Sequence, residues 1–278
     1  MIEFKNMQDP LGNHSMWAKW GPRGEDVAAL ARRFLKTLDL LREIDPVFKD
    51  WWFVRGPFNC VPMNEMDYRH LATLIAEHVS RDDDGTPEPE YGFYGSALNN
   101  DDQRSPRAAA LSVHAGNIHP APSPAFWNTA QLRTDELIPE DTTVFTPDLF
   151  RRALLALVSG WEPTLCSLLS RELLRVDAPP PPIFYPGTLI LPPPRKPKIG
   201  LAWMTYLEPP LASLVTPPRS AIVERTDEGG LLMIATMDRF SIANPKHMAV
   251  AREIEATLAA ADAFLWPPDT GRRGAYRH

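Results

Sequence analysis

The order of apolar segments between residues 199 and 265 constrains the fold more than any other feature of this chain. An apolar run from Ile199 to Leu207 is followed by Glu-Pro-Pro and predicts one strand. Two later runs, 221–225 and 231–236, are separated by Thr-Asp-Glu-Gly-Gly, whose glycines can adopt a positive φ. These two runs therefore predict an antiparallel hairpin.

An amphipathic helix is predicted to follow this hairpin. Asn244 is suited to cap the helix, and Pro245 suits its first position. Apolar residues then recur every three or four positions, at Met248, Ala251, Ile254, Leu258, Ala261 and Leu265. A sheet needs a cover for its apolar face, and this helix has the apolar stripe to provide one.

Two segments nearer the N-terminus share this helical periodicity. The first has Glu25-Asp26 in its first turn, where negative charge suits the helix dipole, and should end at Asp45-Pro46. The second covers residues 71–79 and follows a capping pair formed by Asn64 and Asp67. Both segments predict helices with one apolar face.

A third helix is predicted in the middle of the chain. It should begin at Thr146-Pro147-Asp148, which combines a capping side chain with a proline at the first position, and end at Gly160. The next apolar segment is ambiguous, because residues 164–169 fit a strand while residues 165–174 fit a helix.

Short apolar runs elsewhere predict further strands. Residues 91–98 and 108–113 fit two strands that pair as a hairpin with a long polar tip. A short strand is also compatible with residues 2–4. The region 114–140 is rich in Pro and Asn and predicts irregular structure.

These elements favour an α+β fold, a mostly antiparallel sheet flanked by helices, because they show no regular βαβ alternation. We expect one domain over residues 1–278, since 44% hydrophobic residues can supply a large core. Residues 178–198, with a run of four prolines and another of three, predict a long extended connection across the fold. The cluster Trp51-Trp52-Phe53 is expected in the core, with an exposed anchor patch as the alternative.

Charge and cysteine content indicate the partners and the compartment. A net charge of −6 argues against nucleic acid or an anionic membrane as a partner, and is compatible with a basic partner protein. Cys60 and Cys166 form no disulfide framework. The sequence shows neither a signal peptide at its N-terminus nor an apolar run long enough to span a bilayer. We therefore expect a cytoplasmic protein.

Motifs for catalysis or cofactor binding are missing. His70 and His78 are too far apart for a helical zinc pair, and the chain contains no C-x-x-C or H-E-x-x-H motif. It also contains no nucleophile elbow and no phosphate-binding glycine loop. We expect no metal, no cofactor and no enzymatic activity.

Two acidic runs are the candidate binding residues. Asp82, Asp83 and Asp84 occupy one predicted loop, and Asp101 and Asp102 occupy the tip of the predicted 91–113 hairpin. They lack the spacing of a calcium-binding loop. Exposed acidic side chains suit contact with a basic protein surface, so we expect both runs to contact a partner.

Two groups of residues resemble the signature of a known family, the immunity protein 52 family. They lie at opposite ends of a region of about residues 17–265. The first group is Trp20-x-x-Arg23-x-Glu25-Asp26-Val27-Ala28, Ala31-Arg32-Arg33-Phe34-Leu35, Leu38, Ile44-Asp45-Pro46 and Trp51. The second is Gly200-Leu201-Ala202-Trp203-Met204-Thr205-Tyr206-Leu207, Gly229 to Thr236 and Asn244-Pro245-x-His247.

The resemblance implies an α+β antidote of a bacterial polymorphic toxin system. Members of that family are encoded beside toxins with a restriction-endonuclease-like nuclease domain, often effectors of the type VI secretion system. The chain would then bind such a toxin in the producing cell and neutralise it stoichiometrically. The family offers no catalytic residues to transfer.

Two other functions remain open. The first is metal-assisted hydrolysis by His114, His119 and the acidic loops, since these groups include the side chains that bind metal ions. The second is an interaction scaffold that binds through the proline-rich segment 178–198, where Pro194-Arg-Lys-Pro197 fits a P-x-x-P pattern.

Overall fold

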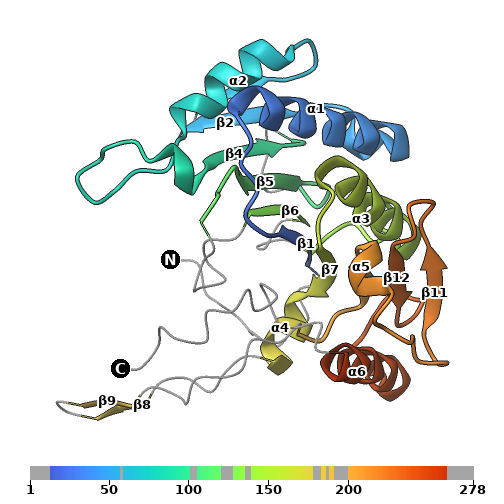
Figure 1. Cartoon of the computed structure of the whole chain (residues 1–278). Helices are drawn as coiled ribbons and strands as arrows, with labels where there is room; N and C mark the ends of the chain where they lie inside the picture. The colour runs from blue at the N-terminus through green and yellow to red at the C-terminus, as the bar shows by residue number, and fades with distance from the viewer. Residues whose placement is uncertain are drawn as a thin grey trace.

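Ten antiparallel strands form the main sheet (Figure 1). The structure, a computed structural model, describes residues 13–56, 59–100, 105–119, 128–134, 139–177, 183–185, 188–190 and 200–261. From one edge to the other the order is β11 (Ile222–Arg225), β12 (Leu231–Ile234), β10 (Met204–Leu207), β7 (Leu165–Ser170), β1 (His14–Trp20), β6 (Asn128–Thr134), β5 (Ala109–Ala115), β4 (Phe93–Leu98), β2 (Trp52–Gly56) and β3 (Asn59–Pro62).

Strand β1 lies between the two halves of this sheet. Ala18 is opposite Ala130 of β6 on one side and opposite Cys166 of β7 on the other. Alternate residues of β1, Met16, Ala18 and Trp20 among them, are buried, while the residues between them are half-buried. This period of two matches a strand with one face on the core.

Three long helices lie together along one side of the sheet (Figure 1). They are α1 (Val27–Ile44), α2 (Tyr68–Glu77) and α3 (Pro147–Trp161), and α1 contacts both of the others. The side chains of Asp26, Asp67 and Thr146 accept hydrogen bonds from backbone N–H groups in the first turns. The three predicted helices are therefore confirmed, each with a side-chain cap that satisfies an exposed donor.

The expected roles of several boundary residues were wrong. Asp26 precedes α1 as its cap, and Glu25 instead pairs with Arg23 and Arg33. Asn64 does not cap α2, because its amide donates to Asp50. Gly160 does not end α3, which continues to Trp161 and closes at a left-handed residue, Glu162, with a φ of 48°.

Residues 200–261, which we call the C-terminal unit, contain the predicted elements in the predicted order. Strands β11 and β12 form the expected hairpin, and β10 pairs with β12, although β10 begins at Met204 and not at Ile199. The prolines after β10 start a short helix, α5 (Pro209–Ala212). Helix α6 (Pro245–Ala260) begins with the Asn244 cap, and Leu265 lies outside the described residues.

The prediction of irregular structure over 114–140 was wrong, because β6 runs through it. Asn128, Ala130, Leu132 and Thr134 alternate inward in this strand, and half of these inward residues are polar. The 91–98 and 108–113 hairpin is confirmed as β4 and β5. Short 3-10 turns precede β2 at Pro46–Phe48 and β4 at Pro89–Tyr91.

The ambiguous segment after α3 contains a strand followed by a helix. Strand β7 confirms the strand prediction, and α4 (Arg171–Asp177) follows it directly. Of the proline-rich segment 178–198, the structure describes two short strands, β8 (Ile183–Tyr185) and β9 (Thr188–Ile190), which pair with each other. The possible strand at residues 2–4 lies outside the described residues.

The core is rich in aromatic side chains. Trp51, Trp161 and Trp203 are fully buried, as is Phe53. The expectation that Trp51 and Phe53 belong to the core is therefore confirmed, while Trp52 is half-buried.

Candidate interaction site

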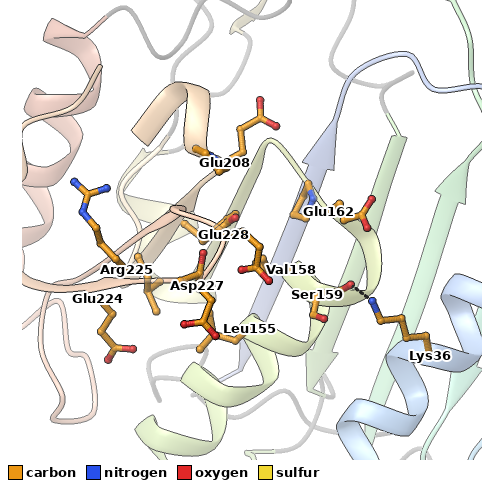
Figure 2. A pocket seen from close by; sticks show the side chains of 15 residues that line it. Lys36, Leu155, Val158, Ser159, Glu162, Glu208, Glu224, Arg225, Asp227 and Glu228 are labelled. Atoms are coloured by element: carbon orange, nitrogen blue, oxygen red, sulfur yellow. Dashed lines mark hydrogen bonds between the residues drawn. The ribbon is translucent and has the colours of Figure 1, made fainter. Parts of the chain in front are cut away.

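An acidic groove of about 500 Å³ lies between the C-terminal end of α3 and the turn that joins β11 to β12 (Figure 2). Its apolar lining comes from α3 and the sheet, and includes Leu155, Val158, Tyr206 and Leu232. We call this surface the acidic groove. Five of its lining residues carry carboxylates, Glu162, Glu208, Glu224, Asp227 and Glu228, against two cations, Lys36 and Arg225.

Two of the five carboxylates are neutralised by arginines of the helices. Arg33 of α1 lies 3.0 Å from Glu162, and Arg151 of α3 lies 3.0 Å from Glu224. The cation Lys36 turns toward the main chain, since its Nζ donates to the Ser159 carbonyl at 2.7 Å (Figure 2). These contacts hold the α3 side of the acidic groove together.

The remaining carboxylates have no cationic partner within the described part of the chain. Glu208, Asp227 and Glu228 form no ion pair with any described residue, and Asp227 and Glu228 are exposed in the hairpin turn. Negative charge therefore concentrates at the mouth of the acidic groove. A cation brought by a partner would find carboxylates there that no described side chain neutralises.

Burial changes the ionisation of two groups in the acidic groove. Loss of hydration raises the pKa of Glu208, and a hydrogen bond with Thr164 opposes this shift. Burial also raises the pKa of Tyr206, in the same direction as that of Glu208. A nearby cation would favour the charged form of Glu208 and lower its pKa.

The turn beside the acidic groove has a defined geometry. Thr226 Oγ1 accepts a hydrogen bond from the Gly230 N–H at 3.0 Å, and Gly229 has a φ of 87°. A Cβ atom at Gly230 would lie 2.4 Å from the Tyr206 hydroxyl oxygen, so only glycine fits against this ring. The two glycines thus fix Asp227 and Glu228 at the edge of the acidic groove.

The predicted acidic loop lies elsewhere on the molecule. Asp82, Asp83 and Asp84 follow α2 and are exposed, as expected, near the β4 side of the sheet (Figure 1). The Asp82 carboxylate accepts hydrogen bonds from the N–H groups of Asp84 and Thr86, at 3.0 and 2.7 Å. Asp82 therefore stabilises the turn of the loop, whereas the exposed side chains of Asp83 and Asp84 can contact a partner.

The other predicted binding residues, Asp101 and Asp102, lie outside the described residues. The acidic groove was not predicted from the sequence. Its carboxylates come from the residue after α3, the residue between β10 and α5, strand β11 and the β11–β12 turn, and these segments span more than 60 residues of the chain. The one sequence signal was the acidic pair Asp227-Glu228 inside the predicted hairpin turn.

The two histidines considered for metal binding contact aromatic rings. His114 stacks on Tyr94 with ring centroids 4.2 Å apart, and its Nε2 lies 2.8 Å from the Tyr91 carbonyl oxygen. His119 stacks on the Tyr91 ring at 4.4 Å. Among the residues described, no three or more His, Cys, Asp or Glu side chains are grouped as a metal site would require.

Membrane insertion by a helix finds no support in the described elements. None of the helices in the described ranges is both long enough and apolar enough to cross a bilayer.

Comparisons with known proteins identify a family. No curated protein matches the chain. Among solved structures, Pseudomonas aeruginosa T6SS protein PA0821 is similar in fold, with a TM-score of 0.50 and 11% identity over 90% of this chain and 75% of that chain. The family model of immunity protein 52 matches residues 14–266. Because this match covers nearly the whole chain, the chain belongs to the immunity protein 52 family.

Proposed function

We propose that this protein is the antidote of an antibacterial nuclease toxin, which it neutralises in the cytoplasm of the producing cell by stoichiometric binding. The observation that carries this proposal is the family match over residues 14–266. The fold likeness to a type VI secretion protein is compatible with a toxin delivered by that system.

The charge of the chain supports a nuclease as the target. A nuclease must present a basic surface to the phosphates of its substrate. The net charge of −6 complements such a surface, and so do Glu208, Asp227 and Glu228, which form no ion pair with any described residue. Complementary charge accelerates association and disfavours wrong partners.

The acidic groove also has the mixed character of a protein interface. Its floor is apolar, with Leu155, Val158 and Tyr206, and its rim carries charge. Protein interfaces commonly surround an apolar centre with a polar rim. The exposed loop at Asp82 to Asp84 is a second proposed contact, and so are Asp101 and Asp102.

Coexpression with the product of the neighbouring gene, which the proposal takes to be the toxin, tests the proposal. The two proteins should copurify in a fixed ratio, and adding the antidote to the purified toxin should abolish DNA or RNA cleavage once that ratio is reached. A catalytically inactive toxin provides the partner for calorimetry. Toxin that still cleaves nucleic acid in the presence of excess antidote would refute the proposal.

A toxin that does not cleave nucleic acid would refute only the assignment of the target as a nuclease. If the neighbouring toxin is neutralised in a fixed ratio but cleaves neither DNA nor RNA, the immunity function stands and the nuclease assignment is wrong.

A further inference from the structure

Strand β11 is an edge of the main sheet with one free side. It pairs with β12 alone, and no described backbone group bonds to its other side. An unpaired edge presents N–H and C=O groups that can add a strand from another chain.

Only the second half of β11 carries charged side chains, Glu224 and Arg225, of the kind that blunt an edge. Ile222 and Val223 are 40% and 42% exposed and leave the first half of the strand apolar. The opposite edge differs, since β3 ends in Pro62, a residue that cannot donate to a ladder and blunts an edge. The apolar edge of β11 therefore marks a surface suited to a partner.

Strand β11 also borders the acidic groove. Side chains alternate along a strand, so Ile222 and Glu224 share one face. Glu224 faces α3, because it pairs with Arg151 and lines the acidic groove. A strand added beside β11 would run along Ile222 and reach Asp227 and Glu228 at the turn.

The negative charge around β11 and the acidic groove indicates which kind of chain can bind there. A second copy of this chain would bring a net charge of −6 and a second set of acidic side chains to the same place. Like charges in close contact are unfavourable, so self-pairing is opposed. An extended segment that carries Lys or Arg can pair with the free edge and can also place cations beside the carboxylates that no described cation pairs with.

We infer that β11 and the acidic groove together bind an extended basic segment of the toxin, which pairs with β11 as an additional strand. Its cationic side chains lie against Asp227, Glu228 and Glu208. This inference rests on the proposed function and specifies how the partner is held. Backbone bonds to the edge supply affinity, while the carboxylates select basic side chains.

Amide hydrogen exchange of the full chain, free and bound to the inactive toxin, tests the pairing. The Thr226 N–H already bonds to the Gly230 carbonyl, so in this register the amides of Val223 and Arg225 face the free side of β11. The amides of Val223 and Arg225 should exchange at least about tenfold more slowly in the complex, because added strand bonds protect them. If the complex forms but these amides exchange as in the free protein, the inference is wrong and the proposed function stands. If no complex forms, the proposed function itself fails.

Charge reversal tests the role of the acidic groove. The variant Asp227→Lys/Glu228→Lys should bind the toxin at least about tenfold more weakly. Glu43→Lys/Glu65→Lys makes the same change in net charge at two exposed sites on α1 and before α2, and should change the affinity less than about twofold. Equal losses in the two variants would show that only net charge matters and would overturn the inference.

A concentration series identifies the alternative occupant. If the amides of β11 in the free protein become protected as its concentration rises, a second copy occupies the edge. That result would also overturn the inference. Circular dichroism of each variant checks that the fold is retained.

Discussion

Thr37 of α1 lies directly against Gly160 of α3, so that a Cβ atom at position 160 would be 2.1 Å from Thr37 Oγ1. The two helices can approach this closely only because glycine has no side chain. We expect Gly160→Ala to lower the free energy of unfolding by about 1–3 kcal/mol, through overpacking. Urea unfolding measures this change.

A double-mutant cycle distinguishes overpacking from other causes. Thr37→Ala removes the nearest atom and leaves the Thr37 Cβ position, which is 3.1 Å from the added atom. The double variant should therefore recover part of the lost stability. Helix propensity alone favours alanine over glycine at this position. A Gly160→Ala protein more stable than the parent would show that propensity outweighs overpacking, and would contradict the prediction.

A buried carboxylate joins β1 to the C-terminal unit. Glu140 lies 2.7 Å from His14 Nδ1, accepts a hydrogen bond from Thr134 at 2.8 Å and pairs with Arg239. Glu140→Ala should lower the free energy of unfolding by about 3–5 kcal/mol, since it leaves buried polar groups without their acceptor. The exposed variant Glu43→Ala should change it by less than about 0.5 kcal/mol, and equal effects would refute the prediction.

The raised pKa of Glu208 predicts a pH-dependent gain in stability on removing its charge. The folded protein holds the proton of Glu208 more tightly than the unfolded chain does, so ionisation disfavours folding as the pH rises. Glu208→Gln should therefore be more stable than the parent above the folded pKa. The difference should vanish below the unfolded pKa of 4.5, where Glu208 is protonated in both states.

Thermal unfolding from pH 3 to pH 8 measures this difference. Glu162→Gln is the control with the opposite sign, because its hydrogen bond with Arg33 lowers the pKa of Glu162. That variant should lose stability at neutral pH and match the parent in acid, below the folded pKa of Glu162. A Glu208→Gln protein that is less stable than the parent at pH 7 would contradict the assignment.

The loop at Asp82 to Asp84 provides a separate prediction for toxin binding. Asp83→Lys/Asp84→Lys leaves the turn-forming Asp82 carboxylate in place. The variant should associate with the toxin more slowly, and its association rate should depend less on salt. Stopped-flow association at several salt concentrations measures both effects. Unchanged rates, compared with the Glu43→Lys/Glu65→Lys variant, would remove this loop from the interface.

The sequence predicted the elements whose burial is apolar and periodic. Helices α1, α3 and α6 carry apolar stripes and capping residues, so local chemistry defines them. Strand β6 escaped prediction because Asn128 and Thr134 point inward with their polar groups satisfied by hydrogen bonds. Inward polar residues interrupt the apolar alternation on which strand prediction depends.

The acidic groove could not be predicted because it depends on sheet register. Tyr206 lies opposite Leu232, and Leu232 lies opposite Glu224, only in the observed pairing of β10, β12 and β11. A shift by one residue would turn each of these side chains to the other face. The sequence defines the hairpin turn, whereas the groove requires the position of α3 above the sheet.

The central position of β1 also affects when the main sheet can be completed during translation. The ribosome completes β1 at Trp20, but its second neighbour, β7, ends only at Ser170, 150 residues later. At about 5 to 20 residues per second, β1 therefore waits roughly 8 to 30 s for its second neighbour. For the proposed antidote this means that the main sheet is still incomplete in any chain whose synthesis has not passed β7.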